Sequence, residues 1–262
     1  MLTSLPQTQV GNRLLAALPV EEYARVLPHL EYVSLSPGQV VCEPGERMEH
    51  TYFPVSSVVN LLYMMESGET TEVGIVGAEG LVGVALFMGG GTAPYRAVAQ
   101  TSGGVVRLRA AATLEEFARG GEFQRVLLRY TQALMVQISQ TAVCNRLHTV
   151  EQQFCRLLLL NHDRVRSNEL LMTQERIGSL LGVRRECVTH VARHLQDARL
   201  ISYVRGHIRI LDRRGLEASV CECYRVVENE FERLLNRRPE RTAQARTRPA
   251  PSSRELQTGW TG

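Results

Sequence analysis

The sequence contains no lysine, so all 30 of its basic side chains other than histidine are arginines. Every cationic contact from a side chain of this kind is therefore a planar guanidinium, which can grip a phosphate or a base edge through two donors. No apolar run approaches the roughly 20 residues of a membrane span, and the first residues lack the basic and apolar segments of a secretory signal. We therefore expect a cytoplasmic protein that does not enter a membrane.

The common catalytic motifs are also missing. The sequence has no G-x-S-x-G, no Walker sequence and no H-E-x-x-H. The glycine run at 89–91 is followed by Thr92 and lacks the lysine with which a phosphate-binding loop holds its nucleotide. No other spacing pairs a nucleophile with a base, so the sequence predicts a protein that is not an enzyme.

The charge is unevenly distributed along the chain. Residues 1–110 hold six arginines and ten acidic residues, a net charge of −4, whereas residues 148–238 hold 16 arginines and 12 acidic residues, a net charge of +4. A protein that neutralises DNA phosphates concentrates its cations in the half that touches the duplex. The distribution therefore favours DNA binding by the C-terminal half.

The basic half contains the pattern of a helix-turn-helix in QERIGSLLGVRRECVTHVAR, residues 174–193. Thr173 is a suitable N-cap for the first helix, and Gly178 is small enough to let the following segment cross closely. Gly182 supplies the positive φ that a tight turn between two helices needs. We predict that this motif binds double-stranded DNA.

The second helix is expected over 184–198, with Val188, Val191 and Leu195 as its buried stripe. Its opposite face is polar and arginine-rich, which suits a helix that lies in a major groove. Two short strands around Arg205 and Gly206 then predict a wing. The residues expected to contact DNA are Thr173, Arg184, Arg185, Glu186, Thr189, His190, Arg193, Arg205 and His207.

The N-terminal half has a different pattern, in which short β-rich runs alternate with turn signals. After an N-terminal arm over 1–18, this pattern predicts a β jelly roll over 19–114. The expected strands lie near 32–35, 40–42, 51–53, 58–64, 71–75, 98–101 and 105–108. Together the two halves indicate an α+β protein.

A long helix is expected over 115–147, between the jelly roll and a DNA-binding domain over 148–236. One stripe of this helix follows the alternating spacing of four and three residues of a coiled-coil seam. We favour a dimerisation helix and a homodimer, although the same stripe would also fit packing on the jelly roll. The stripe consists of Phe123, Leu127, Tyr130, Leu134, Gln137 and Thr141. Residues 237–262 lack periodicity and predict a disordered tail.

This order of elements resembles the Crp/Fnr family of bacterial transcription regulators. The likeness is strongest over 173–211 and extends to GAEGLVGVALF at 77–87 and CNRLHTVEQQF at 144–154. The resemblance implies a jelly-roll sensor domain, a dimer that reads a palindrome, and an effect on RNA polymerase. It also implies that Arg185 reads guanine and Glu186 reads cytosine, whereas His190 replaces a second guanine-reading arginine and predicts an altered half-site.

The segment that corresponds to the family's cyclic AMP pocket departs from the family pattern. Val84, after Gly83, stands where the cyclic AMP receptors have a ribose-binding glutamate, and Ala93 and Pro94 stand where they have an arginine and a serine. Because an uncompensated buried phosphate is costly, we expect an effector other than cyclic AMP, of unknown identity. The alternatives are a cyclic nucleotide bound through a shifted Arg96, and a sensor domain that serves only as a scaffold.

The six cysteines, at 42, 144, 155, 187, 221 and 223, form no C-x-x-C pair. The Fnr type of iron–sulfur cluster is excluded, because only Cys42 precedes residue 144. Cys187, His190 and His194 share one helix face, with Cys221 and Cys223 further along the chain, and would be a conceivable metal site. However, two of those three positions are expected at the DNA, and no spacing matches a zinc finger. The sequence therefore predicts no metal site and no cofactor.

Overall fold

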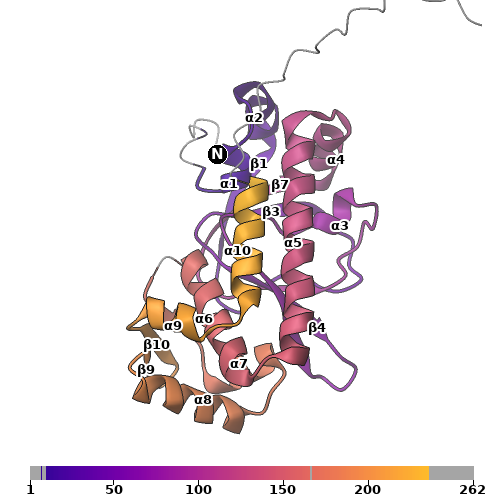
Figure 1. Ribbon diagram of the computed structural model, residues 1–262. Coiled ribbons are helices and arrows are strands. Elements are labelled where there is room, and N and C mark those ends of the chain that lie inside the picture. Colours follow the sequence, from indigo (N-terminus) through magenta and orange to yellow (C-terminus); the bar gives the residue numbers. More distant parts are fainter. Residues whose placement is uncertain (1–6, 8–9, 166, 236–262) are drawn as a thin grey trace, which may run out of the picture.

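The computed structural model describes residue 7, residues 10–165 and residues 167–235 of the chain. A β-rich N-terminal half and a mainly helical C-terminal half pack against each other, with two long helices lying along one side (Figure 1). The tail predicted over 237–262 lies outside the described residues. None of the described helices combines the length and the hydropathy that a membrane span needs.

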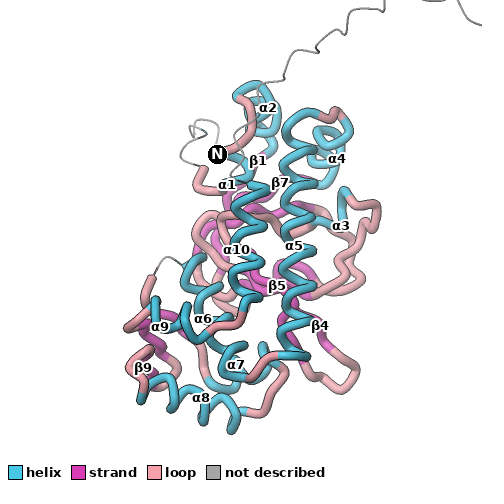
Figure 2. Tube along the Cα trace, in the orientation of Figure 1, coloured by secondary structure: helices cyan, strands magenta, loops and turns pink. Residues whose placement is uncertain are grey.

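The N-terminal half is a sandwich of two antiparallel sheets. One sheet has the order β1-β7-β3 and the other the order β2-β6-β4-β5, and both lie behind the helices in Figure 2. The predicted strands are confirmed, with shifts of a few residues at their ends. Their bounds are Leu30–Leu35 for β1, Val40–Cys42 for β2, His50–Pro54 for β3, Val59–Met64 for β4, Thr70–Val76 for β5, Arg96–Ala99 for β6 and Gly103–Arg109 for β7.

Short helices close the sandwich. Two of them, α1 (Arg13–Ala16) and α2 (Val20–Val26), precede the 3-10 turn η2 (Leu27–His29), and α3 (Val84–Phe87) follows β5. Asn12 caps α1 with its side-chain oxygen and donates from Nδ2 to the carbonyls of Pro54 and Gly80, each at 2.9 Å. This buried amide ties the start of the described chain to the sandwich.

The helix expected over 115–147 is two helices. The first, α4, covers Ala110–Ala118, and the second, α5, covers Gly121–Leu147. The break falls at Gly120 and Gly121, which have φ of +79° and +81°. A side chain at either position would be strained. The glycine pair therefore ends α4 and lets the chain change direction before α5.

The predicted dimer seam on α5 is wrong, because that stripe belongs to the protein's own core. Phe123, Tyr130 and Leu134 are at most 2% exposed, and they belong to the same core cluster as the strands of the sandwich. The polar member Gln137 accepts a hydrogen bond at 2.7 Å from the backbone N–H of Ile75 in β5. The stripe therefore packs on the jelly roll, which was the alternative interpretation.

The described part of the C-terminal half contains the predicted helix-turn-helix and wing, together with three further helices and one further strand. Its helices are α6 (Val150–Val165), α7 (Gln174–Leu181), α8 (Arg185–Asp197), α9 (Arg213–Ser219) and α10 (Glu222–Leu235). The strands β9 (Ile201–Val204) and β10 (His207–Ile210) form the wing hairpin. A third strand, β8 (Glu169–Leu171), was not predicted from the sequence; it precedes α7 and completes the sheet β8-β10-β9.

The two halves are joined along α6 and α10. Arg164 of α6 forms a 2.7 Å ion pair with Glu79 of the sandwich, and Asn161 of α6 accepts a hydrogen bond from Gln100. The last described helix, α10, runs alongside α5 (Figure 1), and its Phe231 meets the ring of Tyr130 edge to face, with the ring centroids 6.3 Å apart. The C-terminal half is thus held against the sandwich by polar and apolar contacts together.

Candidate nucleic-acid interface

The helix-turn-helix forms for the local reasons that the sequence indicates. Thr173 caps α7 by accepting a hydrogen bond from the N–H of Arg176 at 3.2 Å. Gly182 ends α7 in the left-handed region with φ of +66°. A side chain at Gly178 would lie 2.8 Å from the carbonyl oxygen of Val183, so only glycine lets the turn approach the helix this closely.

The recognition helix α8 has one buried and one exposed face. Val188, Val191 and Leu195 are at most 7% exposed and pack in the core of the C-terminal half. The opposite face is open to solvent, as the sequence predicts. It presents Arg184, Arg185, Glu186, Thr189, His190 and Arg193.

The arginines of this face form no ion pair with any other described residue. Arg184 and Arg185 at the start of α8 and Arg193 two turns later are all exposed. By contrast, Arg209 pairs with Glu169 at 2.5 Å and Arg213 pairs with Asp163 at 2.7 Å. A guanidinium without a carboxylate partner keeps its donors available for a phosphate or a guanine.

The wing turn adds a fourth exposed arginine. Arg205 and Gly206 have φ of +50° and +84°, which is the pair of positive φ angles that a two-residue hairpin favours. Arg205 and His207 are both exposed, and Arg205 forms no ion pair with another described residue. The tight turn therefore projects a cation at the tip of the wing.

A groove of about 540 Å³ separates the start of α7, the exposed side of α8 and the wing turn. Among the predicted residues, the structure brings Thr173, Arg185 and Arg205 to this groove, together with Thr189 and Arg193. Six further lining residues were not predicted as DNA contacts from the sequence: Gln174, Glu175, Ala192, Gln196, Tyr203 and Gly206. Gln174 accepts a hydrogen bond from Thr189 at 2.9 Å, so it orients a predicted contact residue. The sequence carried one signal for Gln174, its place directly after the N-cap.

The start of α8 lacks a side-chain cap. Arg184 occupies the N-cap position with an extended backbone and makes no capping hydrogen bond. The first backbone N–H groups of the helix therefore keep their donors, and the helix dipole favours an anion there. A DNA phosphate meets this requirement.

The three residues of the predicted effector loop lie in the sandwich. Gly83 has φ of +118° and precedes α3, which begins at Val84. Arg96 begins β6 and lies 3.2 Å from Glu43 in an ion pair, with about a third of its side chain exposed. Arg96 would have to leave Glu43 in order to bind a cyclic phosphate.

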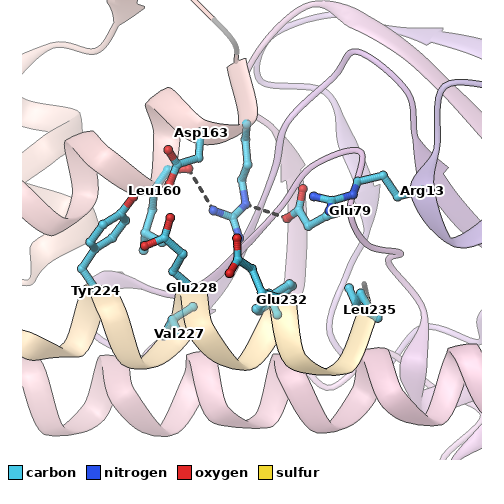
Figure 3. A pocket seen from close by; sticks show the side chains of 11 residues that line it. Arg13, Glu79, Leu160, Asp163, Tyr224, Val227, Glu228, Glu232 and Leu235 are labelled. Carbon is cyan, nitrogen blue, oxygen red and sulfur yellow. Dashed lines mark hydrogen bonds and ion pairs between the residues drawn. The ribbon is translucent and has the colours of Figure 1, made fainter. Parts of the chain in front are cut away.

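A second cavity, of about 160 Å³, lies at the junction of the two halves. Figure 3 shows Glu228 and Glu232 of α10 projecting into it, with Asp163 and Glu79 on its other sides. Because its carboxylates outnumber its guanidiniums, this cavity does not suit a cyclic phosphate. The sequence indicated no site here, since the lining of this cavity comes from four segments that are far apart along the chain.

The metal site considered on the recognition helix does not form. Cys187 is exposed, and His194 turns toward α6, where its Nδ1 lies 2.7 Å from a carboxylate oxygen of Glu151. Cys221 and Cys223 lie in the core of the C-terminal half. Among the described residues, the side chains that lie close enough together to hold a metal ion form another group. Cys187, His190 and His194 do not belong to it.

Two family models match the chain, one in each half. The cyclic nucleotide-binding domain matches residues 32–119, and the Crp-like helix-turn-helix domain matches residues 152–219. No curated protein matches the sequence at a significant level. The two matched segments coincide with the sandwich and with the α6-to-α9 part of the DNA-binding half.

Solved structures give the same fold at low sequence identity. A putative transcriptional regulator of the Crp/Fnr family from Eubacterium rectale aligns with a TM-score of 0.64 and 16% identity, covering 78% of this chain and 96% of its own. FixK2 from Bradyrhizobium japonicum aligns with a TM-score of 0.63 and 16% identity, covering 73% and 98%. CLP from Xanthomonas campestris, described as c-di-GMP responsive, aligns with a TM-score of 0.58 and 15% identity, covering 74% and 100%. With both family domains present in this order, the chain belongs to the Crp/Fnr family of transcription regulators, which are not enzymes.

Proposed function

We propose that the protein is a cytoplasmic, homodimeric regulator that reads a DNA palindrome and acts on RNA polymerase at its promoters. The observation that carries this proposal is the set of four exposed arginines without ion-pair partners, on α8 and at the wing turn. Three of them, Arg185, Arg193 and Arg205, line one groove, and the fourth, Arg184, stands at the uncapped start of α8. Cations and free N–H donors in this arrangement fit a phosphate backbone on either side of a major groove.

Base discrimination rests on Arg185 and Glu186 in the first turn of α8. A guanidinium matches guanine O6 and N7, and a carboxylate accepts from a cytosine N4. His190, one turn further along, donates a single hydrogen bond and cannot form the bidentate contact of an arginine. We therefore propose a half-site that differs from the cyclic AMP receptor's at the base pair opposite His190. Thr173 and His207 add backbone contacts from the two edges of the groove.

The dimer forms through a face of α5 that the sandwich and α10 leave open. Leu128 is 44% exposed, Met135 56% and Leu147 71%. Leu128 and Met135 lie seven residues apart, and Gln132, Ser139 and Ala142 continue the alternating spacing of four and three residues. This second seam, rather than the buried stripe, supplies the apolar contacts of a parallel helix pair.

The effector is a molecule other than cyclic AMP. Val84 provides no acceptor for ribose hydroxyls, and Arg96 already has a carboxylate partner in Glu43. A buried cyclic phosphate would need that guanidinium for itself. The alternative, a cyclic nucleotide bound through Arg96, requires the Glu43 pair to break.

The proposal is tested by fluorescence anisotropy of the purified chain on a family-type palindrome and on its scramble, at two salt concentrations. We expect selective binding to the palindrome that cyclic AMP does not change. Glu186→Ala should cost about 1–3 kcal/mol on the palindrome and relax the preference at one base pair. Selectivity that appears only with cyclic AMP would favour the alternative effector, and equal binding to both DNAs by wild type and variant would contradict base reading by α8.

The dimer is tested in the same assay and by sedimentation. Met135→Arg buries a charge in the second seam and should convert the dimer to a monomer with loss of palindrome binding. The matched control is Val20→Arg, since Val20 is 72% exposed on α2 and lies off that seam. A dimer that survives Met135→Arg would mean that another surface pairs the subunits.

A further inference from the structure

Three cysteines and one histidine meet where α5 ends and α10 begins. Cys144 lies in the last turn of α5 and His148 directly follows it, whereas Cys221 and Cys223 flank the first residue of α10. One ligand atom from each of the four lies within 4.8 Å of all the others. The three thiols are buried, at most 3% exposed, and the histidine side chain is 15% exposed.

The separations match those around a tetrahedral metal ion. The sulfurs of Cys144 and Cys221 are 3.6 Å apart, and the sulfur of Cys223 is 3.5 Å from Nδ1 of His148. Bonds of about 2.3 Å to sulfur and about 2.0–2.1 Å to nitrogen at tetrahedral angles place two sulfurs about 3.8 Å apart and a sulfur and a nitrogen about 3.6 Å apart. The remaining pairs of ligand atoms lie within 4.8 Å of one another.

The histidine is oriented as a metal ligand by a carboxylate. Its Nδ1 faces the sulfur of Cys223, and its Nε2 lies 3.5 Å from a carboxylate oxygen of Glu222. Metal-binding histidines usually give their other ring N–H to a carboxylate or a carbonyl, which fixes the ring and its tautomer. Glu222 stands between the two cysteines of α10, so one short segment supplies two ligands and the orienting group.

A buried guanidinium balances the charge of such a centre. A divalent ion with three thiolates and a neutral imidazole has a net charge of −1. Arg156 of α6 is 7% exposed, donates to Thr141 at 2.9 Å, and has no carboxylate in ion-pair distance among the described residues. It lies close enough to all three cysteines for charge interactions. A buried cation without an ion-pair partner is costly, and a thiolate centre beside it lowers that cost.

We propose that these four side chains bind one Zn²⁺ ion in a tetrahedral Cys3His site, which fastens the end of α5 to the start of α10. Zn²⁺ suits this mixture of thiolates and imidazole, and a site with four protein ligands is structural rather than catalytic. Core packing alone does not account for the cluster, because it places the polar Nδ1 of His148 against sulfur only. The ion stabilises the point at which the chain leaves the long helix for the DNA-binding half.

Burial accounts for the state of the thiols before metal binds. It raises the pKa of Cys223 to about 11 and also raises the pKa of Cys144, so these two thiols hold their protons at neutral pH when no metal is bound. Metal binding releases these protons and forms the thiolates that charge-balance Arg156. The inference does not depend on DNA binding, and its test uses no DNA.

The test begins with the reduced full-length chain and two probes, Zn²⁺ and Co²⁺. We expect one Zn²⁺ per chain by elemental analysis. Titration of the metal-free chain with Co²⁺ should saturate at one equivalent, with thiolate charge-transfer absorption and the strong ligand-field bands of tetrahedral cobalt. Zn²⁺ should then bleach these bands. A reduced chain that takes up no Co²⁺, or takes it up without thiolate absorption, overturns the proposal.

Variants assign the site to its residues. Cys223→Ser should weaken Zn²⁺ binding by at least about 100-fold, and Glu222→Gln, which keeps all four ligands, by about 10–100-fold with unchanged stoichiometry. Cys42→Ser is the matched control, since Cys42 is buried in the sandwich, and should leave the cobalt spectrum unchanged. If Cys223→Ser does not fold, the wild-type spectrum and Glu222→Gln still decide the matter.

The competing interpretation is a disulfide between Cys144 and Cys221. Mass spectrometry of the air-exposed chain detects that bond directly. A disulfide together with no cobalt uptake by the reduced chain would overturn the metal site. A cobalt spectrum that survives Cys223→Ser, or that is lost equally in Cys42→Ser, would overturn it as well.

Discussion

Arginines on the exposed face of α8 and the wing and arginines at the junction of the two halves have the same side chain and opposite surroundings. On α8 and the wing, Arg185, Arg193 and Arg205 are exposed and form no ion pair with a described residue. At the junction, Arg164 is 7% exposed, pairs with Glu79 at 2.7 Å and lies over the ring of Phe231. In a chain without lysine, Arg164 therefore differs from the exposed arginines of α8 and the wing in its partner carboxylate and its burial, and not in residue type.

The largest effect is expected at the junction. Arg164→Ala leaves Glu79 as a nearly buried carboxylate without its cation and removes the contact with Phe231. Breaking one side of a buried pair costs about 3–5 kcal/mol, which should appear in the free energy of unfolding by urea. The control is Arg193→Ala, an exposed and unpaired arginine whose loss should change stability by less than about 0.5 kcal/mol. If Arg164→Ala and Arg193→Ala lowered the free energy of unfolding equally, the buried ion pair of Arg164 would contribute no more to stability than an exposed arginine does.

The pH dependence of folding stability at Glu72 provides a second test of the same junction. This β5 residue is 9% exposed, and burial raises its pKa to about 7, although nearby arginines oppose the shift. The arginines are Arg156, Arg164 and Arg176. The folded state therefore holds a proton that the unfolded state releases near its ordinary pKa of 4.5. The stabilising contribution is present below that value and is lost as pH rises through about 7.

Glu72→Gln should accordingly stabilise the protein by on the order of 1–3 kcal/mol near pH 8 and by much less near pH 4. Unfolding curves at a series of pH values measure this difference. The Glu69→Gln variant, at an exposed position on the same hairpin, serves as the control and should show no such dependence. A constant difference across pH would mean that Glu72 stays charged in the folded protein.

The smallest effect is expected at the wing. Arg205→Asn keeps a residue that tolerates φ of +50° and removes the charge, so it isolates the phosphate contact from turn strain. Binding to the palindrome and its scramble should weaken alike, by about 1 kcal/mol. The slope of log affinity against log salt should fall by about two, because a dimer loses one contact in each half-site. A change confined to the palindrome would mean that Arg205 reads a base.

The strands and the helix-turn-helix were predictable because their signals are local. Turn residues bound each strand, and Thr173 and Gly182 mark the ends of α7 by their own backbone requirements. The face by which α5 packs was not predictable. Its buried stripe and its exposed stripe both alternate by four and three residues, and periodicity does not say which one the protein's own sheet covers.

The other features that the sequence did not predict also depend on contacts between residues that are far apart along the chain. The strand β8 forms only because β10 returns to pair with it, and the segment before α7 is too short to show a period. The four candidate metal ligands come from the end of α5 and the start of α10, on either side of the DNA-binding elements. No motif of fixed spacing can represent such a group, so the sequence predicted none.

The position of α10 also limits which surface of α5 is open to a neighbouring molecule. The sandwich covers one side of α5 and α10 lies along another, whereas Leu128 and Met135 remain exposed. The last described helix of the chain therefore acts as a shield for the long helix, because it withdraws a second side of α5 from any contact with other molecules.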